Sequence, residues 1–400
     1  MPQTIEQKTL FSETNLFSQG VQAGEFTFLA QDARGPDGTV GAAPSTEQQA
    51  RQCLVNLDIG LRASGQSSAD VVSLAVYLSD YGDATAVSRT LRDRFGDDAP
   101  AVNFVGVNDL DGGCRVRMDA IATSSEDREI LRIADLPLSV GAGCHGVRIG
   151  DWFFLSGTDA ANGDGRIPMP SSIQSQTTEV LTRIGRILAG HKLGLGTLCR
   201  TFMFMPGTRH RPGYGEARKK VYQGVFTDDA YPPNSGIYIR SLGENILLRS
   251  MAIAYRGEQR IVTSPQVRLA PGSFSQSVRV GDWLLLAGQD AVTFDRVVEC
   301  EGSLAGQTEA TLRHTKDIVE AAGGTLDDIV KTTVYLIGGI NRAECAEAYR
   351  SFFAAHSRSR TMPAGLTVVV DELSPRCLVE IDAVAYLPTR GQSAAKIKLV

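Results

Sequence analysis

A short apolar run with the composition of a buried strand occurs three times along the chain. The runs start at a glycine followed by an acidic residue, span residues 24–33, 150–160 and 281–291, and are separated by nearly equal lengths of sequence. Short continuous apolar runs of this kind are typical of strands that are buried on both faces. Their regular recurrence predicts an internal threefold repeat.

Further landmarks follow each run in the same order. A predicted helix has a glutamine near its start (Gln49, Gln176 and Gln307). A proline precedes the penultimate strand (Pro100, Pro233 and Pro363), and the closing strands end in Ala-Ile-Ala, Ala-Ile-Ala and Ala-Val-Ala. Several landmarks in one order and at similar spacing support the repeat.

One copy reads as strand, strand, helix, strand, helix, strand, strand. Residues 46–63 place apolar side chains three and four positions apart, which predicts an amphipathic helix. Residues 70–78 and 327–336 are rich in Val and Tyr and predict strands, and residues 342–355 predict the second helix. Two helices on one face of a mixed sheet would bury the apolar sides of both, so the fold class is α+β.

The repeat divides the chain into residues 1–127, 128–258 and 259–400, joined by polar linkers at 124–138 and 259–272. Each sheet would keep one face that no helix covers. Packing the three bare faces around a common axis hides them. We therefore expect an intramolecular pseudo-trimer, and further self-association stays open.

Composition narrows the function. The net charge of −5 gives no general attraction to nucleic acid or anionic lipid, and no apolar run has the ~18 residues of a membrane span. Residues 1–14 lack the apolar segment of a secretory signal, and the seven cysteines form no CxxC pair. We expect a cytoplasmic protein with reduced thiols and with no metal, cofactor, membrane or nucleic-acid partner.

Three stretches resemble the RidA/YjgF family. They are residues 70–72 with 328–336, the Phe-Ser-Gln runs at 17–20 and 274–277, and the closing strand at 379–385. The resemblance covers nearly the whole chain three times, with the copy at 128–258 the most divergent. It implies three RidA-like (chorismate-mutase-like) α/β sandwich units with ligand clefts between neighbours. Typical members hydrolyse enamines and imines such as 2-aminoacrylate to the 2-keto acid and ammonia.

The chain departs from the family at its active site. The deaminases hold the substrate carboxylate with an arginine two residues after the proline, where this chain has Val102, Ser235 and Gly365. None of these side chains can replace a bidentate guanidinium contact. The acidic residue of the family's last strand survives as Glu380, while the other copies have Arg117 and Arg249. These arginines either bind an anion from a new position or lie in degenerate clefts.

Other residues are candidates for the same clefts. An aspartate follows the second strand of every copy (Asp32, Asp159 and Asp290) and is read either as a cleft carboxylate or as a turn former. His145 stands where the other copies have Gln19 and Gln276, so it is either a proton shuttle or a hydrogen-bonding substitute. The family's aromatic cleft residue corresponds to Phe17 and Phe274, with Gly143 in the middle copy.

Two remaining features favour structural roles. The basic stretches at 209–211 and 218–220 read as a solvated helix face, with an anion site in a neighbouring cleft as the alternative. Cys114 and Cys377 correspond to Ile246 in the middle copy, and a position that accepts isoleucine favours packing.

The sequence therefore favours a metal-free hydrolase, deaminase-like enzyme or lyase that acts on a small imine, enamine or carbonyl compound, which can be anionic, in an inter-repeat cleft. Loss of the clamp arginine argues against standard 2-aminoacrylate deamination. Glu380, Asp290 and His145 are the catalytic candidates. Arg117, Arg249, Phe17, Phe274, Asp32 and Asp159 are the substrate-binding candidates. The alternative is a non-catalytic protein that binds a small ligand or acts as a scaffold.

Overall fold

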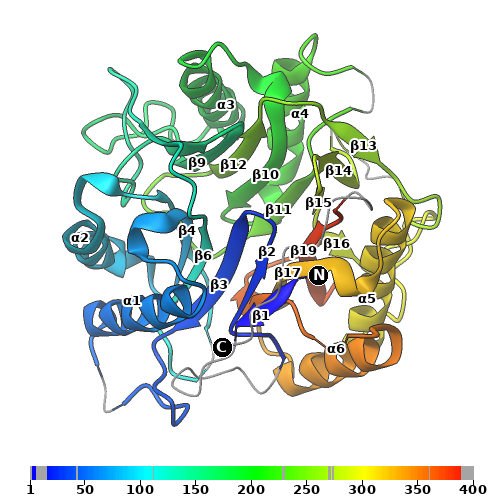
Figure 1. Cartoon of the computed structure of the whole chain (residues 1–400). Helices are drawn as coiled ribbons and strands as arrows, with labels where there is room; N and C mark the ends of the chain where they lie inside the picture. The colour runs from blue at the N-terminus through cyan, green and yellow to red at the C-terminus, as the bar shows by residue number, and fades with distance from the viewer. Residues whose placement is uncertain are drawn as a thin grey trace.

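The computed structural model describes residues 2–5, 16–41, 44–110, 112–227, 230–268, 272, 274–359 and 361–388. It contains three units arranged around a common axis, with helices on the outside and sheets toward the centre (Figure 1). The fold is therefore an α+β pseudo-trimer made by one chain, as the sequence predicts. Most of the N-terminal stretch 1–14 lies outside the described residues.

The three units contain corresponding series of strands and helices. Unit one contains β1 (Gln3–Ile5), β2 (Gly20–Ala23), β3 (Phe26–Asp32), α1 (Thr46–Ala63), β4 (Val71–Leu78), α2 (Ala84–Phe95), β5 (Ala101–Gly106) and β6 (Val116–Ala122). Unit two contains β7 (Arg128–Leu131), β8 (Gly146–Ile149), β9 (Trp152–Thr158), α3 (Ile173–Ala189), β10 (Leu198–Met205), α4 (Arg211–Tyr222), β11 (Asn234–Tyr238) and β12 (Arg249–Tyr255). Unit three contains β13 (Arg260–Val262), β14 (Ser277–Val280), β15 (Trp283–Leu286), β16 (Gln289–Asp290), α5 (Leu304–Ala321), β17 (Ile329–Ile337), α6 (Arg342–His356), β18 (Ala364–Val370) and β19 (Val379–Tyr386).

The three sheets have one topology. In unit one the strand order is β1-β2-β3-β6-β4-β5, and the corresponding strands follow the same order in units two and three. Only the last pair of each sheet is parallel (β4–β5, β10–β11 and β17–β18). The middle unit therefore has the same fold despite its divergent sequence. The exact domain boundaries remain a prediction.

The edge strands β1, β7 and β13 differ from the prediction. Residues 124–138 and 259–272 are predicted to be linkers, but β7 and β13 lie inside them. Each is short, and each pairs with the next strand along the chain. A strand of three or four residues on a sheet edge has too little apolar periodicity to be recognised in sequence.

The recurring glutamine of the first helix has a structural role. In α3, Gln176 donates through Nε2 to the carbonyl of Asn245 at 2.9 Å and accepts from the amide of Leu247 at 2.9 Å. Gln49 and Gln307 make the same two contacts to the loop before their own closing strands. The glutamine thus fixes the closing strand against the helix in every unit.

Five apolar clusters hold the fold together. Three lie between the helices and sheet of one unit each. The other two combine residues of all three units and lie between the bare sheet faces. Equivalent aromatic residues meet in one of these shared cores, where the Phe26 ring lies 5.5 Å from that of Trp152 and 5.3 Å from that of Trp283.

A polar belt links the units through buried ion pairs. Arg200 of unit two contacts Asp382 of unit three at 2.6 Å, and Lys331 of unit three pairs with Asp119 of unit one. All four side chains are at most 13% exposed. Among the described residues, no helix is long and apolar enough to cross a bilayer.

Truncating the recurring glutamine should destabilise the protein. We expect Gln176→Ala to lower the free energy of unfolding by about 1–3 kcal/mol, because it removes the two hydrogen bonds that this buried side chain makes to the backbone of residues 245 and 247. The control is Gln174→Ala on the exposed side of the same helix, which should change stability by less than about 0.5 kcal/mol. Urea unfolding followed by circular dichroism measures both, and equal effects would contradict this role.

Candidate active site

Each unit packs the last strands of its sheet against the first strands of the next unit. β5 lies against β9, β10 against β14 and β15, and β18 against β3. We call these the 1–2 seam, the 2–3 seam and the 3–1 seam. Hydrogen bonds from backbone amides cross all three seams. The amide of Val102 donates to the Ser156 hydroxyl, that of Gly288 to the Ser235 hydroxyl, and that of Ser18 to the carbonyl of Pro363.

The 3–1 seam is filled by an aromatic ring and ion pairs. Phe17 is 5% exposed and packs edge-on against Tyr349 at a centroid distance of 5.6 Å. Asp32 accepts from Nε of Arg34 at 2.8 Å, and its carboxylate lies 3.5 Å from the Arg117 guanidinium. Arg117 and Asp32 are thus brought together, as are Phe17 and the core of unit three.

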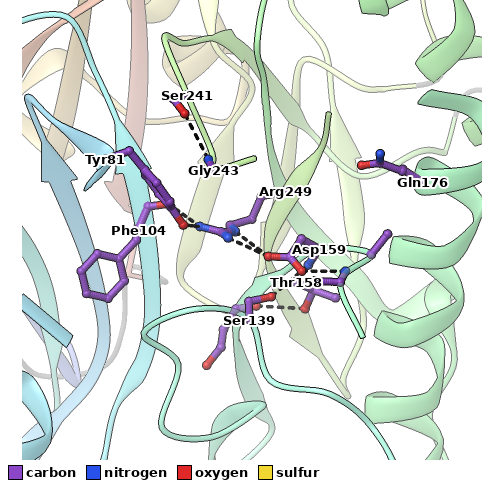
Figure 2. Close-up of polar contacts among 12 residues, drawn as sticks. Tyr81, Phe104, Ser139, Thr158, Asp159, Gln176, Ser241, Gly243 and Arg249 are labelled. Carbon is purple, nitrogen blue, oxygen red and sulfur yellow. Dashed lines mark hydrogen bonds and ion pairs between the residues drawn. The ribbon is translucent and has the colours of Figure 1, made fainter. Parts of the chain in front are cut away.

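The 1–2 seam is filled by a buried ion pair. Figure 2 shows the Arg249 guanidinium between Tyr81 of unit one and Asp159 of unit two. Arg249 donates to Asp159 at 2.6 Å, to the Tyr81 hydroxyl at 2.6 Å and to the carbonyl of Phe104 at 2.9 Å. Both members of the ion pair are 1% exposed, so no space is left for a ligand. A hollow of about 400 Å³ on the rim of this seam is bordered by Tyr81 but not by Arg249 or Asp159.

The 2–3 seam contains a pocket of about 390 Å³, which we call the 2–3 pocket. Unit two contributes α4 and β11 to its walls, and unit three contributes β16, β19 and the stretch before β14. Its charged side chains are Arg211, Arg218, Arg268, Asp290 and Glu380. The structure therefore brings Glu380, Asp290 and Phe274 of the predicted site together, without Arg117, Arg249 or His145.

Glu380 is the acidic group of this pocket. It is 7% exposed and lies opposite Asp290 in the pairing of β16 with β19. Burial, together with the neighbouring carboxylates of Asp382 and Asp290, raises the pKa of Glu380 well above its ordinary value against the opposing effect of Arg200 and Arg211. Its carboxyl group forms no hydrogen bond to any side chain or amide in the described ranges. It is therefore available to a ligand, and its surroundings favour the protonated form.

Arg218 is the buried cation of the pocket. It is 4% exposed, donates to the Tyr214 hydroxyl at 2.5 Å, and lies 4.7 Å from the Tyr214 ring centroid and 5.8 Å from that of Phe274. Within the described part of the chain it has no carboxylate partner, and its Nε has no acceptor. A buried cation without a counter-ion is costly, so an anionic ligand would be favoured here.

The neighbouring arginines add to this positive character. Arg268 lies 3.1 Å from Asp290, so those two charges balance. Arg211 lines the pocket and forms no ion pair with any described residue. Among the described residues, the pocket thus has two arginines without an ion-pair partner, Arg211 and Arg218.

The interpretation of the basic stretches as a solvated helix face is wrong for Arg211 and Arg218, and correct for Lys219 and Lys220, which are exposed. The sequence spacing could have indicated a common role for these residues. Arg211, Tyr214 and Arg218 are three and four residues apart and therefore share one helix face. Arg218 is the eighth residue of α4, where α2 has Leu91 and α6 has Tyr349. Only unit two presents an arginine to its seam from this position.

His145 lies outside the pocket and supports the backbone. Its Nδ1 accepts from the amide of Ile133 at 3.1 Å, so Nε2 donates to the carbonyl of Leu136 at 3.0 Å. Gln276 makes the equivalent contacts in unit three, to the amide of Ser264 and the carbonyl of Val267. This geometry favours the hydrogen-bonding substitute over the proton shuttle.

The recurring aspartate forms an ion pair with arginine in every unit. Asp32 is paired with Arg34 and Arg117, Asp159 with Arg249, and Asp290 with Arg268. Asp159 also accepts from the amide of Ala161 at 3.0 Å, which is the turn-forming role. Both interpretations of this position therefore find support in its contacts.

The cysteine pair behaves as packing. Cys114 and Cys377 lie with Ile246 in one shared apolar core, and burial raises the pKa of Cys377 to about 12. In the described ranges no three His, Cys, Asp or Glu side chains come together as metal ligands would.

Comparisons with known proteins agree with this architecture. The endoribonuclease L-PSP family model matches residues 8–124 and 266–387, which together exceed half of the chain. A RutC family protein of Pyrococcus horikoshii is 35% identical over 29% of this chain and 87% of its own length. The 2-iminobutanoate/2-iminopropanoate deaminase of Escherichia coli is 32% identical over 32% of this chain and 96% of its own. A chorismatase crystal structure aligns with a TM-score of 0.51 and 14% identity, over 79% of this chain and 93% of that one, which shows a common fold.

His145 should make stability depend on pH. Burial lowers the pKa of His145 below 6.5, so the folded state prefers the neutral ring. The unfolded chain then binds more protons, and this contribution to stability, complete above pH 6.5, is lost as the pH falls through the folded pKa. We expect His145→Gln, which copies units one and three, to fold normally and to lose less stability than wild type between pH 7 and pH 5. Urea unfolding at each pH measures this, and parallel curves for the two proteins would contradict it.

Proposed function

The chain belongs to the endoribonuclease L-PSP (RidA/YjgF) family, and on that premise we propose that it is an enzyme that acts on a small anionic carbonyl or imine compound in the 2–3 pocket. One observation carries the proposal. A buried arginine that has no carboxylate partner in the described part of the chain and a carboxyl group that favours its protonated form border the same cavity. An anion-binding group and a proton donor at one site are the minimum that such an enzyme needs.

Arg218 and Arg211 would hold the anionic group of the substrate. A carboxylate beside Arg218 would supply the counter-ion and the hydrogen-bond acceptor that no described residue provides. The rings of Tyr214 and Phe274 flank the guanidinium and restrict its orientation. This assignment replaces the strand arginine of the family's deaminases by an arginine from α4.

Glu380 would then act at the reacting carbon. Its protonated carboxyl can donate to the nitrogen of an imine, which makes the carbon electrophilic, and the resulting carboxylate can accept a proton from the attacking water. The C–N bond breaks as the carbonyl forms, so imine and water give the carbonyl compound and ammonia. The deaminase of Escherichia coli is named for two such imino acids, but the different position of the arginine and the cavity of about 390 Å³ favour a larger substrate here.

Removing the acid should abolish turnover. With a panel of 2-imino acids generated in solution, from 2-iminopropanoate to aromatic side chains, we expect Glu380→Gln to lower kcat/KM by about 10²–10⁴-fold, since general acid–base catalysis contributes this much. Keto acid formation is the measurement. Equal rates for wild type and variant would remove Glu380 from the mechanism. Binding of these compounds without turnover by wild type would favour a ligand-binding protein.

Removing the buried cation should weaken binding. We expect Arg218→Met to raise KM about 10–100-fold for an anionic substrate, the loss of one charge-assisted contact, with a smaller change in kcat. The matched control is Lys219→Met, which removes the same charge from an exposed position on α4 and should leave both constants unchanged. A change of the same size in both variants would point to a general electrostatic effect and contradict a specific contact.

A further inference from the structure

We propose that Asp382 is a positioning residue of the 2–3 pocket, which acts on Glu380 through its charge and through a buried group formed with Ser235 and Arg200. This inference rests on the proposed function of Glu380. It extends the site beyond the pocket wall to the axis of the pseudo-trimer.

The strand β19 places the two carboxyl groups on one face. Residues two apart in a strand point to the same side of the sheet, so Glu380 and Asp382 both face away from the helices. Asp382 is 5% exposed. Its Oδ1 accepts from the Arg200 guanidinium at 2.6 Å and from the Ser235 hydroxyl, and Arg200 also donates to Ser235 at 2.5 Å. The three side chains are thus joined to one another by hydrogen bonds and lie next to Glu380.

Ser235 connects this group to the pocket. It occupies the position two residues after the proline and accepts from the amide of Gly288 at 2.8 Å. A Cβ atom on Gly288 would lie 2.1 Å from Oε1 of Glu380 and 2.9 Å from Oγ of Ser235. Oε1 of Glu380 and Oγ of Ser235 can therefore occupy these positions at the seam only because residue 288 has no side chain. Any larger residue there would displace one of them.

The groups around Glu380 have opposing effects on its proton. Asp382 on the same strand and Asp290 on β16 favour the protonated form, as does burial, while Arg200 on β10 and Arg211 on α4 favour the carboxylate. Arg268 balances Asp290. The other titratable neighbours of the pocket wall or of the adjoining strands are, among the described residues, Tyr214, Tyr238, Tyr335, His314, Arg218 and Cys377.

Arg200 and Asp382 therefore act on Glu380 in opposite directions. Because they are paired with each other, each offsets the other, and removal of either leaves the remaining charge uncompensated beside Glu380. Loss of Asp382 should favour the carboxylate of Glu380, and loss of Arg200 should favour the acid. Opposite shifts from two partners cannot arise from a general loosening of the fold.

The 3–1 seam provides a matched control. Asp119 and Lys331 stand at the same strand positions as Asp382 and Arg200 and form an equivalent buried ion pair. The neighbouring cleft position there is Arg117, and Gly365 stands in place of Ser235. Asp119→Asn therefore removes an equivalent contact between units without touching the 2–3 pocket.

The experiment follows the titration of Glu380 in the full-length protein labelled with ¹³C at glutamate carboxyls, with the signal assigned by its loss in Glu380→Gln. We expect Asp382→Asn to move the midpoint to lower pH, Arg200→Met to move it to higher pH, and Asp119→Asn to leave it at the wild-type value. No substrate is required. Where one of the two variants does not fold, the other still tests the sign.

Two outcomes would overturn the inference. One is an unchanged midpoint in Asp382→Asn or Arg200→Met, and the other is an equal shift in Asp119→Asn. Either result leaves the proposed function standing if Glu380→Gln still abolishes turnover. Conversely, the expected opposite shifts with no turnover of any imino acid would support the coupling and reject the proposed reaction.

Discussion

The buried ion pairs on the axis are the constraint on which the rest of the structure depends. Every sheet has one face without helices, and closing the three faces on each other takes four charged side chains out of water. Burial of such charges costs least when they are paired. Arg200 meets Asp382 across the 2–3 seam and Lys331 meets Asp119 across the 3–1 seam, whereas the 1–2 seam has Ser73 and Met251 at these positions. The 1–2 seam thus has neither the cation nor the anion of this pair, so neither charge is buried at these positions without its partner.

Fusion into one chain lets the three seams differ. In a symmetric trimer one residue must serve three identical interfaces. Here the eighth position of the second helix is Leu91, Arg218 or Tyr349, and only the arginine faces an open pocket. The other seams gain packing instead. Phe17 against Tyr349 fills one of them, and the Arg249–Asp159 pair fills the other with both side chains 1% exposed. Two seams are thus filled by side chains, and the third keeps an accessible pocket.

The sequence alone was sufficient for the fold and for half of the candidate site. The helix predicted at residues 46–63 matches α1, because its apolar spacing and its cap at Ser45 are local properties. Glu380 and Asp290 were recognisable because they retain a family position or recur in every copy. The cation entered only through the alternative interpretation of the basic stretches, because Arg218 comes from another unit and a basic helix face has the same sequence pattern whether it faces solvent or a pocket. Arg117 and Arg249 were plausible until their partners Asp32 and Asp159 were located beside them in their own units.

The position two residues after the proline explains why the cation had to come from a helix. At residue 365 a Cβ atom would lie 2.5 Å from the carbonyl oxygen of Thr332 and 2.8 Å from the Phe17 ring, so no arginine fits. At residue 235 an arginine would replace the hydroxyl that bonds to Asp382 and Gly288, and it would bring a second guanidinium against Arg200. Restoring the family's clamp would therefore break the axial ion pair that closes the ring. An anion site built on α4 avoids that conflict, because Arg218 reaches the pocket from the side opposite the axis.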